Sequence, residues 1–153
     1  MKNILTIIMI TFAFMAHGQK QVVSAYNANK AGKYADAATY IDEAITVEKA
    51  ALKEKTWRYR GEIYLNIAKD TALVSAYPNA LWTAKDAYLK ARELDVKGNY
   101  DREIITGLGL VQTTAANQGI NDYSSEVYDQ AAGKFDLSAE IAGMFDVLDT
   151  MGI

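Results

Sequence analysis

The apolar residues of this chain recur at helical spacing in three segments, 33–48, 80–95 and 127–142. In the first segment they fall at i, i+4, i+7 and i+8, which places them in one stripe along an α-helix. No stretch shows sustained alternation of apolar and polar residues, so we expect no strands. The pattern predicts an all-α chain. The predicted helices lie near 20–31, 33–48, 52–69, 79–95, 100–118 and 123–149.

The three stripes repeat at an interval of 47 residues without a gap, as Ala37, Ala84 and Ala131 show. Small residues in such a stripe let neighbouring helices approach closely, and the bulkier residues between them fill the groove. Three unrelated amphipathic helices with coincident stripes are the alternative. We expect three helix-turn-helix pairs, over about 20–48, 52–95 and 100–149. The same interval links three further sets of aligned positions, which we call repeat columns: Tyr34, Leu81 and Tyr128; Ile41, Tyr88 and Phe135; and Ala44, Ala91 and Ser138.

Three features predict where the helices end. Gly32 is a typical residue just beyond a helix C-terminus. Pro78 disfavours a helical backbone at Tyr77, so the segment 70–78 is expected to be a loop. In the third pair, extra residues around Asn117–Asp122 are expected to form the corresponding turn.

The first eighteen residues have the pattern of a secretory signal peptide. Lys2 gives a positive start, an apolar run extends from Ile4 to Ala16, and small residues precede a cut between Gly18 and Gln19. The run is shorter than the roughly 20 residues that a membrane span needs. We therefore expect a secreted or periplasmic protein, residues 19–153, with no stable membrane span after cleavage; an uncleaved anchor is the alternative.

Composition limits the chemistry of the chain. Its 153 residues are 50% hydrophobic and 23% charged, the balance of a chain that folds, and the length allows one ordinary domain or two small ones. The net charge of −3, or −4 without Lys2, disfavours nucleic acid as a partner. There is no cysteine, and the only histidine, His17, lies in the leader. We expect no enzyme, no catalytic residue, no metal site and no cofactor, because the common nucleophile–base pairs and zinc ligands are missing.

The helix pairs resemble tetratricopeptide repeats (TPR), in a divergent form. The second pair carries Trp57, Gly61 and Tyr64 on its first helix and Ala84, Tyr88 and Ala91 on its second; the first pair carries Gly32, Lys33, Tyr34, Ala37, Ile41 and Ala44; the third carries Leu108, Gly109, Ala131 and Phe135. The closing proline of the family pattern is missing, and Arg60 stands in place of its leucine. The resemblance covers most of residues 20–142. It implies helix pairs stacked as a short right-handed α-solenoid.

The resemblance also implies that the first helices line a concave groove that binds a protein or peptide segment. Matching positions in the third pair are Glu103, Thr106, Leu110, Thr113 and Thr114, and Val22 belongs to the first. Long polar side chains beside a tyrosine can hydrogen-bond an extended peptide. A merely exposed polar helix face is the alternative. The groove residues expected on the first two pairs are Tyr26, Asn29, Lys30, Lys55, Arg58, Glu62, Leu65 and Asn66.

The leading expectation is a non-enzymatic protein- or peptide-binding scaffold of the bacterial envelope or periplasm. Trp57 and Tyr64 are interpreted as core, whereas Tyr77 and Trp82, beside the 70–78 loop, could stack on sugar rings. A glycan-binding helical envelope module is therefore the rival hypothesis. The apolar end, residues 144–153, suggests association there, or an N-terminal fragment of a larger envelope protein.

Overall fold

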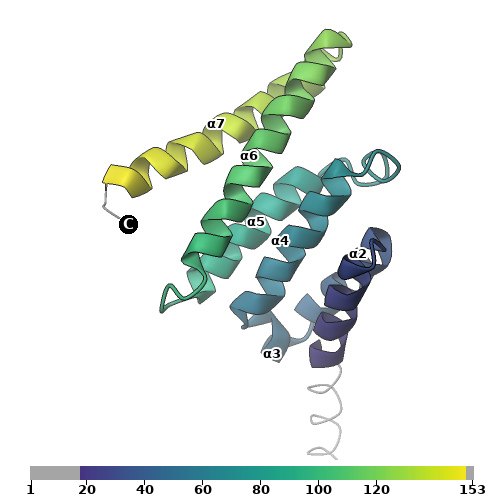
Figure 1. Cartoon of the computed structure of the whole chain (residues 1–153), viewed down its shortest axis with the longest axis vertical. Coiled ribbons are helices and arrows are strands. Elements are labelled where there is room, and N and C mark those ends of the chain that lie inside the picture. Colours follow the sequence, from purple (N-terminus) through teal and green to yellow (C-terminus); the bar gives the residue numbers. More distant parts are fainter. Residues whose placement is uncertain (1–17, 151–153) are drawn as a thin grey trace, which may run out of the picture.

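The computed structural model describes the backbone of residues 18–150 and the side chains of residues 18–147 (Figure 1). All regular secondary structure in this range is helical, as the apolar pattern predicted. The predicted signal peptide lies outside the described residues apart from Gly18. The helices are residues 18–30, α2 (Tyr34–Ile45), α3 (Glu48–Ala51), α4 (Glu54–Lys69), α5 (Ala80–Leu94), α6 (Asp101–Ser124) and α7 (Tyr128–Thr150).

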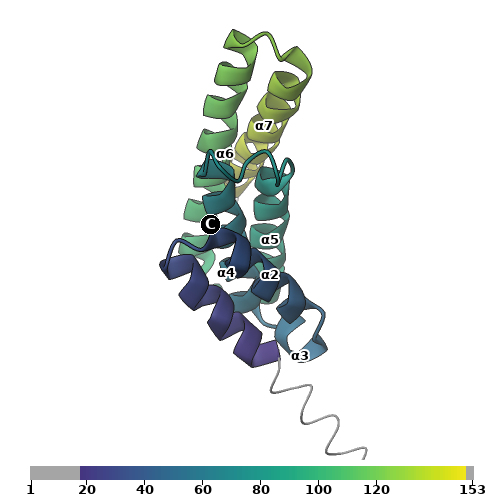
Figure 2. The same ribbon diagram turned by 90° about the vertical axis from the view of Figure 1, so that its right-hand side faces the viewer.

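Helices that follow one another in the chain pack side by side. α4 lies along α5 and α6 lies along α7, so the second and third predicted pairs are packed neighbours (Figure 1). α2 packs against α4 and α5 packs against α6, which joins the pairs. In the first pair, the amide of Gln21 donates a hydrogen bond to Glu43 of α2. Figure 2 shows α6 and α7 extending past the end of α4 and α5.

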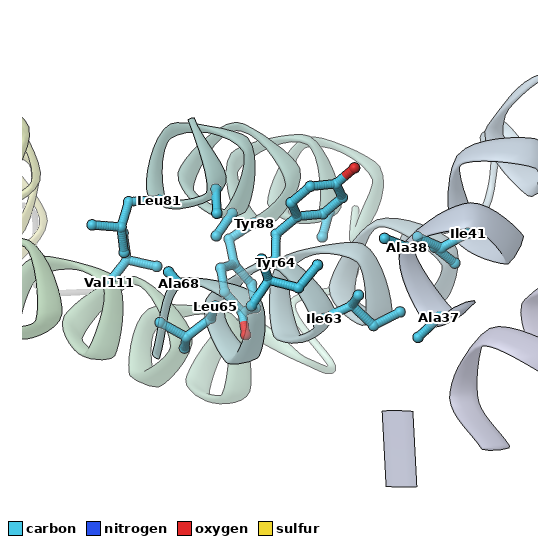
Figure 3. Packing of buried hydrophobic residues seen from close by; sticks show 14 of the residues in the cluster. Ala37, Ala38, Ile41, Ile63, Tyr64, Leu65, Ala68, Leu81, Tyr88 and Val111 are labelled. Atoms are coloured by element: carbon cyan, nitrogen blue, oxygen red, sulfur yellow. The ribbon is translucent and has the colours of Figure 1, made fainter. Parts of the chain in front are cut away.

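The repeated alanines all face the interior. Ala37, Ala84 and Ala131 lie in α2, α5 and α7, and each is at most 1% exposed. All three alanines occupy similar positions near the start of their helices. Ile41 and Tyr88, from the repeat column of large residues, are also buried, and Figure 3 shows them in the shared core cluster. The 47-residue interval therefore marks the buried faces of α2 and α5, whereas of the repeated positions in α7 only Ala131 is buried and Tyr128 and Phe135 are 56% and 39% exposed.

Two of the predicted helix boundaries are confirmed. Gly32 has φ +72°, and the Lys33 N–H donates to the Ala28 carbonyl at 2.9 Å, a pairing that closes a helix C-terminus. Residues 70–79 form turns between α4 and α5, and α5 begins at Ala80, two residues after Pro78. Both boundaries depend on a glycine or proline whose effect on the backbone is local.

The predicted turn around Asn117–Asp122 is wrong, because α6 continues unbroken to Ser124. Gly119 is the reason that this stretch resembles a turn. A Cβ at Gly119 would lie 2.9 Å from the Phe135 ring, so the glycine allows close approach of α7 and does not end the helix. The turn comes later, where Glu126 has φ +64°.

Tyr88 of α5 lies between two glycines of different helices. A Cβ at Gly61 of α4 would lie 2.9 Å from the Tyr88 ring, and one at Gly107 of α6 would lie 2.4 Å from its Cζ. Gly109, which matches the family pattern in the third pair, makes no such contact: a Cβ there would meet nothing within 4 Å. The N-terminal half of α6 therefore packs on α5, and its C-terminal half packs on α7.

Candidate functional site

The predicted groove residues of helix 18–30 and α4 include a polar network. Asn29 Nδ2 donates to Glu62 Oε1 at 3.0 Å, and Asn66 Nδ2 donates to Asn29 Oδ1 at 2.9 Å. Lys30 Nζ lies 3.5 Å from the same Glu62 oxygen, and this carboxylate raises the pKa of Lys30. Four of the eight predicted residues thus bind one another across two helices.

Stacked aromatic and cationic side chains lie beside this network. The rings of Tyr26 and Tyr59 have centroids 5.0 Å apart. Lys30 Nζ lies 5.5 Å from the Tyr26 centroid, and Lys55 Nζ lies 5.3 Å from the Tyr59 centroid. Tyr59 was missing from the predicted set, although it follows Lys55 by four residues, the spacing that places side chains together on a helix.

Arg58 was expected to line an open groove, but the structure buries it. It is only 6% exposed, and its guanidinium carbon lies 3.9 Å from the Tyr100 ring centroid. It forms ion pairs with Glu103 and, at 3.9 Å, with Glu54. Its Nε has no hydrogen-bond partner among the residues that the structure describes. Arg58 therefore ties α4 to the start of α6 and is engaged within the fold.

A hollow of about 660 Å³ lies between α4 and α6, and we call it the α4–α6 groove. It brings together residues that the sequence placed on two different pairs. Thr113 and Thr114 are not among them, and their hydroxyls donate to the Gly109 and Leu110 carbonyls of their own helix. The predicted residues that line the groove are Glu62, Leu65, Asn66, Glu103, Thr106 and Leu110; the others are Lys69, Tyr88, Asn99, Tyr100, Arg102 and Gly107.

Tyr88 reaches the α4–α6 groove from α5 through the gap between the two glycine positions. Burial raises the pKa of the Tyr88 hydroxyl, and the charges of Glu62 and Glu103 raise it further. The hydroxyl therefore stays protonated at physiological pH, and it can donate a hydrogen bond to a carbonyl in the groove.

Tyr64 and Tyr88 are expected to make the fold sensitive to alkali. Burial raises the pKa of both above the ordinary value of 10.0, and Tyr64 also donates to Asp42. The folded state holds these protons more tightly than the unfolded chain, so their contribution is complete below pH 10 and falls as the pH rises above it. Each tyrosine can lower the free energy of unfolding by at most ~1.4 kcal/mol per pH unit there.

Urea unfolding at about pH 9 and about pH 11 measures this loss. Tyr64→Phe should make the difference between the two pH values smaller. Tyr40→Phe, at an exposed tyrosine, is the control and should leave the difference unchanged. An equal effect of both substitutions would contradict the assignment to Tyr64.

A second hollow, of about 940 Å³, lies among the 70–79 turns, the start of α5, the C-terminal half of α6 and the start of α7. We call it the loop pocket. Tyr77 and Trp82, the two aromatic residues interpreted as less constrained, both line it and are half-buried. The sequence did not indicate its polar side chains, since those on α6 belong to the stretch mistaken for a turn. These side chains are Gln118, Asn121, Asp122, Asp129, Gln130 and Lys134.

Trp57 and Tyr64 are part of the packing, as the sequence indicated. Tyr64 is 8% exposed and belongs to the core cluster. Trp57 packs against that cluster, and its indole N–H donates to the Ala51 carbonyl at 2.7 Å. Neither side chain lines the α4–α6 groove or the loop pocket.

Within the described residues, no cluster of three or more His, Cys, Asp or Glu side chains is placed to hold a metal ion. The same residues include no helix with the length and apolarity that crossing a membrane requires. Comparison of the chain with protein-family models, curated proteins and solved structures found no match.

Proposed function

We propose that this protein is an exported, non-enzymatic scaffold of the bacterial envelope or periplasm that binds an extended protein or peptide segment in the α4–α6 groove. One observation supports this most strongly. The TPR resemblance implied one set of groove residues on α4 and another on α6, and members of both sets line the same hollow, among them Glu62, Asn66 and Leu110.

We further propose that the helix pairs form a short right-handed solenoid of the TPR type. Two features favour this arrangement. Ala37, Ala84 and Ala131 are buried at similar positions of the second helices. Tyr88 packs against a glycine on the first helix of its own pair and against another on the first helix of the next pair. A ring shared in this way joins successive pairs.

The groove offers the groups that a peptide backbone needs. Leu110 is 46% exposed and supplies apolar contact, whereas Leu65, which is 3% exposed, is mainly part of the groove wall. The amides of Asn66 and Asn99 each carry donors and an acceptor, so they can bond a backbone in either direction. The Tyr88 hydroxyl adds a further donor. Together these groups suit an extended segment held by its main chain, with an apolar side chain resting on Leu110.

A selection from a displayed peptide library, followed by fluorescence anisotropy with the purified protein, tests this function. Leu110→Asp should weaken the selected peptides at least ~10-fold, because it places a charge against their apolar groups. Ile120→Asp is the control, since Ile120 is 55% exposed on the same helix and lies outside the groove. Peptides that bind Leu110→Asp as tightly as the parent would contradict the proposal.

A further inference from the structure

The loop pocket is lined by the indole of Trp82, which packs against the core cluster but whose N–H is left unpaired within the described residues. The two tryptophans of the chain differ in this respect. Trp57 donates its indole N–H to the Ala51 carbonyl, whereas Trp82 donates to no acceptor among residues 18–147. A Cβ at Gly133 would lie 3.7 Å from Trp82 Cζ2, so α7 passes the indole without a side chain covering it there. Trp82 therefore keeps an apolar surface and one donor for a ligand.

The polar side chains around Trp82 are similarly unoccupied. Asn121, Asp129 and Gln130 form no side-chain hydrogen bond within the described part of the chain. Gln118 is anchored by one end, because its Nε2 donates to the Ala68 carbonyl at 2.6 Å. That bond fixes the amide and leaves its oxygen as an acceptor at the pocket wall.

The charges of the loop pocket balance. Lys134 is paired with Asp122, and both side chains are largely buried. Of the remaining lining residues, Lys69 and Asp129 carry opposite charges. A site without excess charge does not select an anion or a cation, and neutral amides that donate and accept fit a ligand with many hydroxyls.

We propose that the loop pocket binds a neutral oligosaccharide, one of whose sugar rings stacks on Trp82. Tyr77 supplies a second aromatic side chain to the same pocket. The amides of Gln118, Asn121 and Gln130 bond the ring hydroxyls, which act as donors and acceptors in turn. The volume of about 940 Å³ is at the upper end of the range for small-molecule sites, so it accommodates more than one sugar ring. This site is separate from the α4–α6 groove.

Tryptophan fluorescence of the full chain tests the proposal with three neutral probes, the hexasaccharides of glucose linked β-1,4, of glucose linked α-1,4 and of N-acetylglucosamine linked β-1,4. A Trp57→Phe background makes Trp82 the only reporter. At least one probe should give a saturable change in emission. Asn121→Ala with Gln130→Ala should weaken binding at least 10-fold, and circular dichroism should show the parent fold, because both side chains are exposed.

The groove variant Leu110→Asp is the control, and it should bind the sugar as tightly as the parent. Calorimetry with the same three probes checks any case in which fluorescence does not change. No heat of binding with any of them would overturn the proposal. So would unchanged affinity in the Asn121/Gln130 double variant, or an equal loss in Leu110→Asp. Because the peptide test uses the other hollow, either proposal can fail while the other stands.

Discussion

Tyr88→Ala is expected to lower the free energy of unfolding by about 3–5 kcal/mol. The side chain is only 6% exposed, and its ring fills the space between Gly61 and Gly107. Glycines cannot extend into the cavity that the ring would leave, so relaxation requires α4 and α6 to shift. Urea unfolding followed by circular dichroism measures the change.

Phe135→Ala provides the control from the same repeat column. Phe135 packs against Gly119, yet it is 39% exposed, so its removal leaves less empty space. We expect its cost to be less than half that of Tyr88→Ala. Equal costs would mean that contact with a second helix adds nothing at Tyr88, which would contradict the packing described for α6.

Gly107→Ala is expected to cost about 1–3 kcal/mol or more, although alanine usually stabilises a helix interior. The added methyl would lie 2.4 Å from Tyr88 Cζ, and the ring has little room to retreat, because a Cβ at Gly61 on the α4 side would also lie only 2.9 Å from it. Either α6 moves away from α5 or the ring leaves its place. The same urea measurement gives the change in free energy.

Gly109→Ala is the matched control, two residues along the same helix. Nothing lies within 4 Å of a Cβ there, so the substitution should stabilise the protein by about 0.5–1 kcal/mol. In a Tyr88→Ala background, Gly107→Ala should lose its cost, because the two positions interact directly. A cost that persists without the Tyr88 ring would show that another neighbour causes the clash.

Most of the secondary structure could be predicted from local signals. The apolar stripes located the helices, and Gly32 and Pro78 marked two boundaries that the structure confirms. The failure at Asn117–Asp122 has a physical cause. A polar stretch with a glycine is typical of a turn, but the use of Gly119 depends on Phe135, which is sixteen residues away in the chain.

The candidate site was only partly predictable, for a similar reason. The TPR resemblance implied Glu62, Leu65 and Asn66 as groove residues, and they do line the α4–α6 groove. The resemblance could not show that Arg58 is buried, since its burial depends on Tyr100 and Glu103, which lie more than forty residues later in the chain. The polar wall of the loop pocket was missed because it combines side chains of α6 and α7.

Local sequence patterns were enough to predict that the described chain is helical and which faces of α2 and α5 are buried, because periodicity and turn residues act over a few neighbouring positions. The tertiary structure alone decided which glycine receives the Tyr88 ring, how far α6 extends along α7, and which polar side chains remain unpaired. Each of these outcomes depends on contacts between residues distant in the chain, and no local pattern encodes the distance between two packed helices.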